Sequence, residues 1–380
     1  MHRLSTALAF VLAFTVLANA QAIETKAGQA ILVDHETGTV LFAKNADERI
    51  PPASLAKLMT MEVVFDALSK GRIGLQDTVR VSEDAWRRGG EASGGSTMFL
   101  SVNSEVSIEN LIRGVIVQSG NDASITLAEA IAGSEATFAR LMNERARELG
   151  MTDSTFRNAT GLPDPEQRVT LRDMVKLARH LFETYPEFYR IYSEDAFTWN
   201  RIRQPNRNPV LTMGIGGDGL KTGYTEESGY ALVASAEQNG DRLFLAVSGL
   251  ESAKDRREEA RSLLLWGFRS FERRRLFGEG DTVADVRVYG GAQDTVPVRA
   301  QAPIDIFLPI AGRDALTAEV AYEGPVQTPV RVGDPIATLR VRRGDEVTQE
   351  TPLYAAENVE RGPLHRRALD AAREALVFWD

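Results

Sequence analysis

Three short motifs constrain this chain most, because their side chains form one chemical unit only if distant segments of the fold meet. They are separated by about 65 and about 100 residues, and they read Ser54-Leu55-Ala56-Lys57, Ser119-Gly120-Asn121 and Lys221-Thr222-Gly223. The first motif alone is weak evidence, since a serine three residues before a lysine occurs by chance. All three in this order describe a serine nucleophile whose general base is a lysine.

The first motif predicts a nucleophile at the start of a helix. A spacing of three places Ser54 and Lys57 on one helix face, so the lysine amine can reach the serine hydroxyl. Pro51 and Pro52 stop any earlier helix and favour a new helix N-terminus at Ser54. Backbone N–H groups there favour negative charge, so an oxyanion could be stabilised at this point.

Lys57 can act as a base only if it is unprotonated near neutral pH. Burial and a second cation both disfavour an ammonium, and Lys221 is the expected second cation if the motifs converge. Ser119 is the expected proton relay towards a leaving group. Asn121 offers an amide that can orient both the lysine and a substrate peptide group.

The third motif has the residue types of a site for a peptide with a free carboxylate. Lys221 and Thr222 supply a cation and a hydroxyl for that carboxylate. Gly223 has no side chain, so an extended substrate can lie against the backbone as an added strand.

These motifs resemble the SxxK, SxN and KTG set of penicillin-binding proteins and serine β-lactamases. The stretches Ile202–Asn208 and Gln118–Asp122, with the two-domain length, resemble the low-molecular-weight D-alanyl-D-alanine carboxypeptidases. The resemblance implies an α/β (α+β) transpeptidase domain of the penicillin-binding/β-lactamase type with an inserted helical subdomain, followed by a small all-β domain. It also implies peptidoglycan stem peptides as substrates and acylation of Ser54 by β-lactam inhibitors.

Three further residues are expected near the substrate by similarity of local context. Arg207 and Arg256 resemble family arginines near the substrate-binding strand, where a guanidinium suits a terminal carboxylate, although either could equally be a surface ion-pair partner. Tyr224 follows the third motif, where related enzymes often carry histidine or threonine. The resemblance implies an oxyanion hole made by the backbone N–H groups of Ser54 and Tyr224.

The chain is expected to have four parts. Residues 1–20 read as a secretory signal with an Ala18-Asn19-Ala20 cleavage site, which predicts a periplasmic protein. Residues 21–278 form the expected catalytic domain, with helices over 108–117, 123–132, 136–149 and 255–271 and strands near Leu211 and Lys221. Residues 279–358 alternate in short apolar runs, which predicts an all-β domain.

Residues 359–380 form the expected tail. Its apolar residues share roughly one helical face, which resembles the family's amphipathic anchor to the inner-membrane surface. The alternative is a helix that docks on the all-β domain. The net charge of −9 argues against nucleic acid as a partner.

Other functions remain as alternatives. Two of them are enzymes with related motifs, and one is a protein without catalytic activity. A DD-endopeptidase has the same three motifs, whereas a class A β-lactamase needs a glutamate in an E-x-x-L-N stretch, which the chain lacks. A non-enzymatic wall-binding or morphogenetic protein with a vestigial site is the remaining alternative. Residues 214–219 match a dinucleotide fingerprint but are expected to form a turn. With no cysteine and no H-E-x-x-H, neither a metal nor a cofactor is expected.

Overall fold

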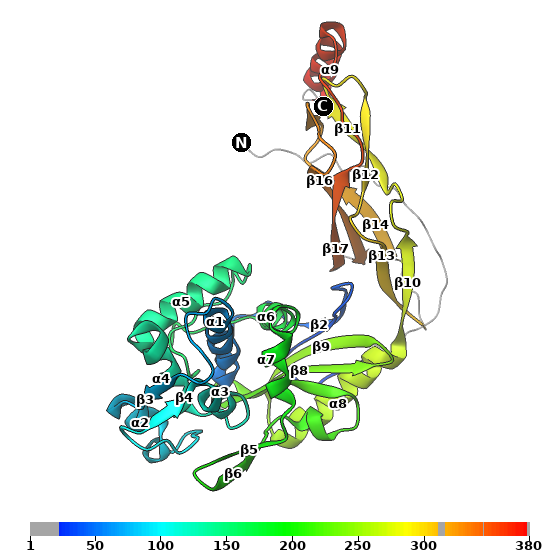
Figure 1. The fold of residues 1–380 in the computed structure, drawn as a ribbon. Coiled ribbons are helices and arrows are strands. Elements are labelled where there is room, and N and C mark those ends of the chain that lie inside the picture. The colour runs from blue at the N-terminus through cyan, green and yellow to red at the C-terminus, as the bar shows by residue number, and fades with distance from the viewer. Residues whose placement is uncertain (1–22, 311–315, 345, 378–380) are drawn as a thin grey trace. The chain divides into compact units, whose positions relative to one another are not determined.

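The computed structural model describes residues 23–310, 316–344 and 346–377, and the chain divides into two compact units. The larger unit comprises Ile23–Glu36 and Leu41–Arg269, and the smaller one comprises Ser270–Asp380 with the segment Thr37–Val40. The predicted signal at residues 1–20 lies outside the described residues. Figure 1 shows the larger unit as a sheet with many helices and the smaller unit as mostly strands.

A five-stranded sheet in the order β2-β1-β9-β8-β7 forms the centre of the larger unit. The pairs β1–β9, β8–β9 and β7–β8 are antiparallel, and β7 is an edge strand. The strands are β1 (Gln29–Asp34), β2 (Val40–Lys44), β7 (Gly217–Thr225), β8 (Gly229–Gln238) and β9 (Asp241–Leu250).

Helices cover both faces of this sheet. Phe244 on β9 meets the ring of Phe182 on α6 (Leu171–Thr184), with ring centroids 6.1 Å apart. Its neighbour Leu243 faces α8 (Ala253–Ser270), because a Cβ at Gly267 would lie 2.7 Å from the Leu243 side chain. Successive residues of a strand point to opposite faces, so α6 and α8 pack on opposite sides of the sheet.

The helical part of the larger unit surrounds α1 (Lys57–Ser69), in which all residues from Lys57 to Ala67 are buried. Its neighbours include α3, α4, α5 and α6 (Figure 1). The remaining elements are α2 (Glu83–Gly89), α3 (Ile108–Ile116), α4 (Asn121–Ala132), α5 (Glu135–Glu148), α7 (Pro186–Tyr189), the short strands β3 (Thr78–Arg80), β4 (Glu105–Ser107), β5 (Ala196–Trp199) and β6 (Ile202–Pro205), and the 3-10 turns Ala53–Ala56, Glu91–Ser93, Arg190–Ser193 and Pro209–Thr212.

The strand predicted near Leu211 is wrong. Residues Pro209–Thr212 form a 3-10 turn, which the Asn208 side chain caps by accepting a hydrogen bond from the backbone N–H of Val210. Proline is favoured at the first position of such a turn and asparagine just before it. The local turn signal of Asn208 and Pro209 therefore decides the structure of this segment.

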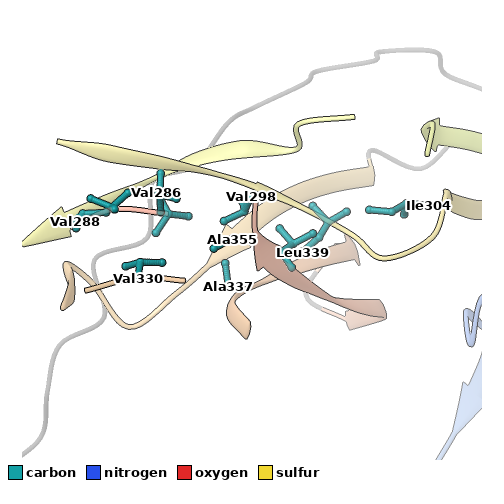
Figure 2. Close-up of a cluster of buried hydrophobic side chains, with 11 residues drawn as sticks. Val286, Val288, Val298, Ile304, Val330, Ala337, Leu339 and Ala355 are labelled. Carbon is teal, nitrogen blue, oxygen red and sulfur yellow. The ribbon is translucent and has the colours of Figure 1, made fainter. Parts of the chain in front are cut away.

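The smaller unit contains the all-β fold that was expected in the C-terminal part of the chain, and its strands begin at Phe271, before the expected start at residue 279. A six-stranded sheet has the order β14-β16-β17-β12-β11-β15, and β10 pairs with β13. Figure 2 shows side chains such as Val286, Val298 and Leu339 gathered in its buried core. The strands are β10 (Phe271–Phe277), β11 (Ala284–Tyr289), β12 (Thr295–Arg299), β13 (Ile304–Pro309), β14 (Leu316–Ala321), β15 (Val326–Gln327), β16 (Pro335–Arg343) and β17 (Glu346–Ala355).

The tail helix α9 (Leu364–Val377) is tied to the all-β domain by polar contacts. Asp370 accepts a hydrogen bond from the backbone N–H of Gly290, and Arg366 donates to the Ala292 carbonyl. Val359 is buried in the apolar core of the domain, so the helix begins only after that core is complete. No helix in the described parts of the chain is long and apolar enough to cross a membrane.

Candidate active site

Ser54 lies in the 3-10 turn Ala53–Ala56 that leads into α1, and the Lys57 Nζ lies 3.2 Å from the Ser54 Oγ. The loop at Gly161 packs directly against this turn. Gly161 has a φ of +80°, and a Cβ there would lie 1.8 Å from the Ala53 carbonyl oxygen. Only glycine therefore allows the loop to approach the nucleophile so closely.

Lys57 is buried and surrounded by hydrogen-bond acceptors. Besides Ser54, its Nζ donates to the Asn121 Oδ1 at 2.8 Å and to the Thr160 carbonyl oxygen. Burial, and next the charge of Arg207, lower the pKa of Lys57 to about 7, against the opposing effect of Asp122 and Glu135. With this pKa, about half of Lys57 is neutral at pH 7 and can accept a proton there.

The geometry also suits the neutral amine. A neutral lysine keeps two N–H donors and gains one lone pair. The two donors can stay on Asn121 and the Thr160 carbonyl, which leaves the lone pair for the Ser54 hydroxyl proton. The contacts around Lys57 thus orient the base towards the nucleophile.

The cation that lowers the pKa of Lys57 is not the expected one. The sequence predicted Lys221 in this role, but Arg207 has it. Burial lowers the pKa of Lys221 itself, followed by the charges of Lys57, Arg207 and Arg256. The charge of Arg207 thus lowers the pKa of Lys57, Lys221 and Arg256, as expected where cations lie close together.

Ser119 lies in the sharp turn between α3 and α4, with a left-handed φ of 61°. Its hydroxyl is buried and has no hydrogen-bond partner in the described chain. The turn is held by the backbone N–H of Gly120, which donates to the Gly114 carbonyl at 2.9 Å. An unpartnered buried hydroxyl costs free energy, and a bound substrate that accepts or donates a hydrogen bond would remove this cost.

Asp122, the residue after this motif, holds the loop at residues 97–100, which lies beside the cleft. Its carboxylate accepts hydrogen bonds from the Thr97 hydroxyl at 2.7 Å and from the backbone N–H groups of Met98 and Leu100, both at 3.0 Å. Asn121 adds a second link, because its backbone N–H donates to the Ser96 carbonyl at 2.8 Å. These bonds hold residues 96–100, the segment that follows Gly94 and Gly95 beside the site.

The third motif lies on the edge strand β7. Lys221 and Thr222 are buried, and the Lys221 Nζ donates to the Thr222 carbonyl oxygen at 3.0 Å. Gly223 touches the turn that carries Ser54, since a Cβ there would lie 3.3 Å from the Ala53 Cβ and from the Leu55 Cγ. The structure thus brings all three motifs together around Ser54.

Both arginines lie in the same cluster of cations. The Arg207 Nη1 donates to the Ser96 Oγ at 2.6 Å, and the Arg256 guanidinium lies 5.5 Å from the ring centroid of Tyr230. Burial lowers the pKa of each of them. Neither has a carboxylate partner among the described residues, so their charges remain available to an anionic ligand.

A cleft of about 390 Å³ opens over Ser54. Tyr224 forms part of its wall, with its side chain 52% exposed and its ring centroid 4.4 Å from that of Tyr230. The cleft is lined by Ser54, Gly94, Gly95, Ser96, Asn121, Thr160, Gly161, Leu162, Pro163, Arg207, Tyr224 and Thr225.

Sequence reasoning missed the Thr160 carbonyl, Gly161, Ser96 and the loop-fixing role of Asp122. Thr160 acts through its backbone, which carries no residue-type signal, and it contacts a lysine 103 positions away. The glycines at positions 94 and 95, followed by Ser96, are the sequence signal that could have marked the loop beside the cleft. Among the described residues no cluster of His, Cys, Asp and Glu could hold a metal ion.

Comparison with known proteins agrees with this geometry. The D-alanyl-D-alanine carboxypeptidase family matches residues 15–252, and the penicillin-binding protein 5 C-terminal domain matches residues 271–361. The chain is 40% identical to D-alanyl-D-alanine carboxypeptidase DacC of Escherichia coli K12, covering 98% of this chain and 95% of that protein.

Two solved structures are also similar. Penicillin binding protein 5 from Haemophilus influenzae is 37% identical with a TM-score of 0.77, covering 90% of this chain and 100% of that one. Penicillin-Binding Protein D2 from Listeria monocytogenes, solved in its ampicillin-bound form, is 28% identical with a TM-score of 0.57, covering 66% of this chain and 100% of that one.

Proposed function

The chain belongs to the D-alanyl-D-alanine carboxypeptidase family, and from this premise we propose that it removes the terminal D-alanine from peptidoglycan pentapeptide stems through an acyl-enzyme on Ser54. The observation that carries the proposal is the contact of Ser54 with a buried Lys57, whose pKa is lowered to about 7. That contact lies beside cations that have no carboxylate partner among the described residues.

Acylation begins with a proton transfer within the first motif and ends with one through the second motif. Lys57 takes the hydroxyl proton of Ser54, and the Oγ attacks the carbonyl carbon of the penultimate D-alanine. The backbone N–H groups of Ser54 and Tyr224 stabilise the resulting oxyanion. The C–N bond then breaks, and the proton held by Lys57 reaches the departing amine through Ser119.

Binding places the scissile bond in this geometry. The peptide adds to the edge strand β7. Gly223 lets the turn that carries Ser54 pack closely against this strand, so the nucleophile lies beside the bound peptide. Its terminal carboxylate lies with Lys221, Thr222 and the two arginines, where a guanidinium can form paired hydrogen bonds. Hydrolysis of the acyl-enzyme follows when Lys57 activates a water molecule.

β-Lactams are expected to acylate the same serine, because their strained amide and carboxylate fit the positions of the scissile bond and the terminal carboxylate. The cleft lining contains no carboxylate among the described residues. A class A β-lactamase needs a glutamate to activate the deacylating water. The β-lactam adduct should therefore be long-lived.

D-Alanine release from a pentapeptide stem tests the function. We expect the purified protein to release one equivalent of D-alanine per stem and Ser54→Ala to release none. A cross-linked dimeric muropeptide in the same assay separates the alternatives, since conversion of the dimer to monomers with the pentapeptide left intact would indicate an endopeptidase. Cellular phenotypes that survive Ser54→Ala would instead favour a non-enzymatic wall-binding role.

We further propose that the protein acts in the periplasm at the inner-membrane surface. The apolar leader supports export, and α9 supports membrane association because Leu364 and Leu369 are 78% and 53% exposed. Large exposed apolar side chains on a helix suit an interfacial position. The hydrogen bonds of Asp370 and Arg366 to the all-β domain would hold that helix at a fixed place on the domain.

A further inference from the structure

The loop whose Thr160 carbonyl accepts a hydrogen bond from Lys57 is itself tied to two helices. The hydroxyl of Thr60, three positions after Lys57 on α1, donates to the Ala159 carbonyl oxygen at 2.7 Å. The backbone N–H of Ala159 donates to the Glu135 Oε1 of α5 at 3.1 Å. The residue before the Thr160 carbonyl is thus held at both of its backbone polar groups.

Asn158 holds the same loop from within. Its Oδ1 accepts hydrogen bonds from the backbone N–H groups of Thr160 and Gly161, at 3.2 and 2.7 Å. These bonds are internal to the loop, so they fix its shape but not its distance from the base. That distance depends on the bonds that come from α1 and α5.

Glu135 also connects this loop to the other wall of the cleft. It is the first residue of α5, its side chain is only 12% exposed, and its Oε2 accepts a hydrogen bond from the Arg88 Nη2 at 2.8 Å. Arg88 lies in the last turn of α2, shortly before residues 94–96, which line the cleft together with residues 160–163. One carboxylate therefore joins the two segments that form the cleft wall.

The charge of Glu135 acts on the base as well. With Asp122 it raises the pKa of Lys57, against the larger opposing effects of burial and of Arg207. Lys221 is a further cation near the base, because the charge of Lys57 lowers its pKa. Glu135 does not line the cleft, so it can act on the reaction only through the loop and through its charge.

We propose that Glu135 is a positioning residue of the acylation reaction, which holds the Thr160 carbonyl against Lys57 and stabilises the charged lysine after it has taken the Ser54 proton. The inference rests on the proposed function and assigns a role in it to a residue outside the three motifs. The base must keep the proton until the leaving group accepts it. A buried anion nearby lowers the free energy of that charged state.

The test measures acylation of Ser54 by a fluorescent penicillin between pH 5 and 9. Glu135→Gln keeps a side-chain oxygen for the Ala159 N–H but has no charge. The midpoint of its pH profile should move to lower pH by about half a unit, with the rate at high pH within about twofold of the wild type. Glu135→Ala also removes the hydrogen bond, so it should show the lower midpoint and lose roughly tenfold of the rate at high pH.

Asp84→Asn is the matched control, because Asp84 pairs with the same Arg88 at 2.9 Å but is not one of the charges that shift the pKa of Lys57. It should leave both the midpoint and the rate unchanged. A wild-type midpoint in Glu135→Gln, or an equal shift in Asp84→Asn, would overturn the proposal, and this comparison decides even if Glu135→Ala does not fold.

The rate at high pH tests the loop separately from the charge. Equal rates there in folded Glu135→Ala and in Glu135→Gln would overturn the positioning role of the hydrogen bond to Ala159. In each of these cases the wild type is still acylated, so the carboxypeptidase stands. No acylation of the wild type at any pH would instead contradict the proposed function.

Discussion

Replacing Arg207 by glutamine should move the pH dependence of Ser54 acylation to higher pH. Burial and the positive charge of Arg207 are the two causes that lower the pKa of Lys57 to about 7. Removing the charge leaves burial alone, so the pKa of Lys57 rises and less of the lysine is neutral at a given pH. The midpoint of the acylation profile should follow that pKa.

The size of the effect in the wild type follows from the lowered pKa. Going from the ordinary 10.5 to about 7 is a preference of about 5 kcal/mol for the neutral amine, and it raises the neutral fraction at pH 7 roughly a thousandfold. With this pKa, about 1% of Lys57 is neutral at pH 5 and about half at pH 7. Acylation should therefore speed up roughly fiftyfold between pH 5 and 7 and at most about twofold above that.

The assay is the second-order rate of acylation by a fluorescent penicillin between pH 5 and 10. Arg256→Gln serves as the control, because Arg256 is a cation of the same cluster whose charge lowers the pKa of Lys221 rather than that of Lys57. Both variants lose a cation that can bind the carboxylate of the penicillin, so the midpoint of the pH profile and not the absolute rate is compared. A midpoint that stays near 7 in Arg207→Gln, or moves equally in both variants, would refute the reasoning.

Two further predictions concern the loop beside the nucleophile and the tail. Gly161→Ala should reduce acylation at least tenfold, since its Cβ would collide with the Ala53 carbonyl, whereas Gly133→Ala has the same left-handed φ with open space around it and should lose only a little stability. Wild-type acylation rates in Gly161→Ala would contradict the packing. A chain ending at Gly362 keeps the buried Val359 and should leave the membrane fraction while remaining active, and its retention there would disprove anchoring by α9.

The sequence predicted much of the site because its signals are local. The spacing of Ser54 and Lys57 predicted their contact, which the structure forms across a 3-10 turn, and the predicted helix over 108–117 is confirmed as Ile108–Ile116. The family resemblance and the order of an α/β domain and an all-β domain are confirmed as well. Each of these rests on neighbouring residues or on motifs with few alternatives.

What could not be predicted depends on contacts between distant segments. The Thr160 carbonyl meets Lys57 across 103 positions, and nothing in its side chain marks it. The choice of Arg207 over Lys221 as the cation that lowers the pKa of Lys57 depends on three-dimensional placement alone. The turn at Pro209 is different, because its Asn208-Pro209 signal was present in the sequence, although a strand was predicted there.

Intact-mass spectrometry of the protein with a penicillin tests the central claim most directly. The account predicts a single acyl adduct that persists for minutes in the wild type and is absent in Ser54→Ala. An adduct that remains in Ser54→Ala would place the nucleophile elsewhere. No adduct in the folded wild-type protein would mean that the three motifs do not form a working acyl-transfer site.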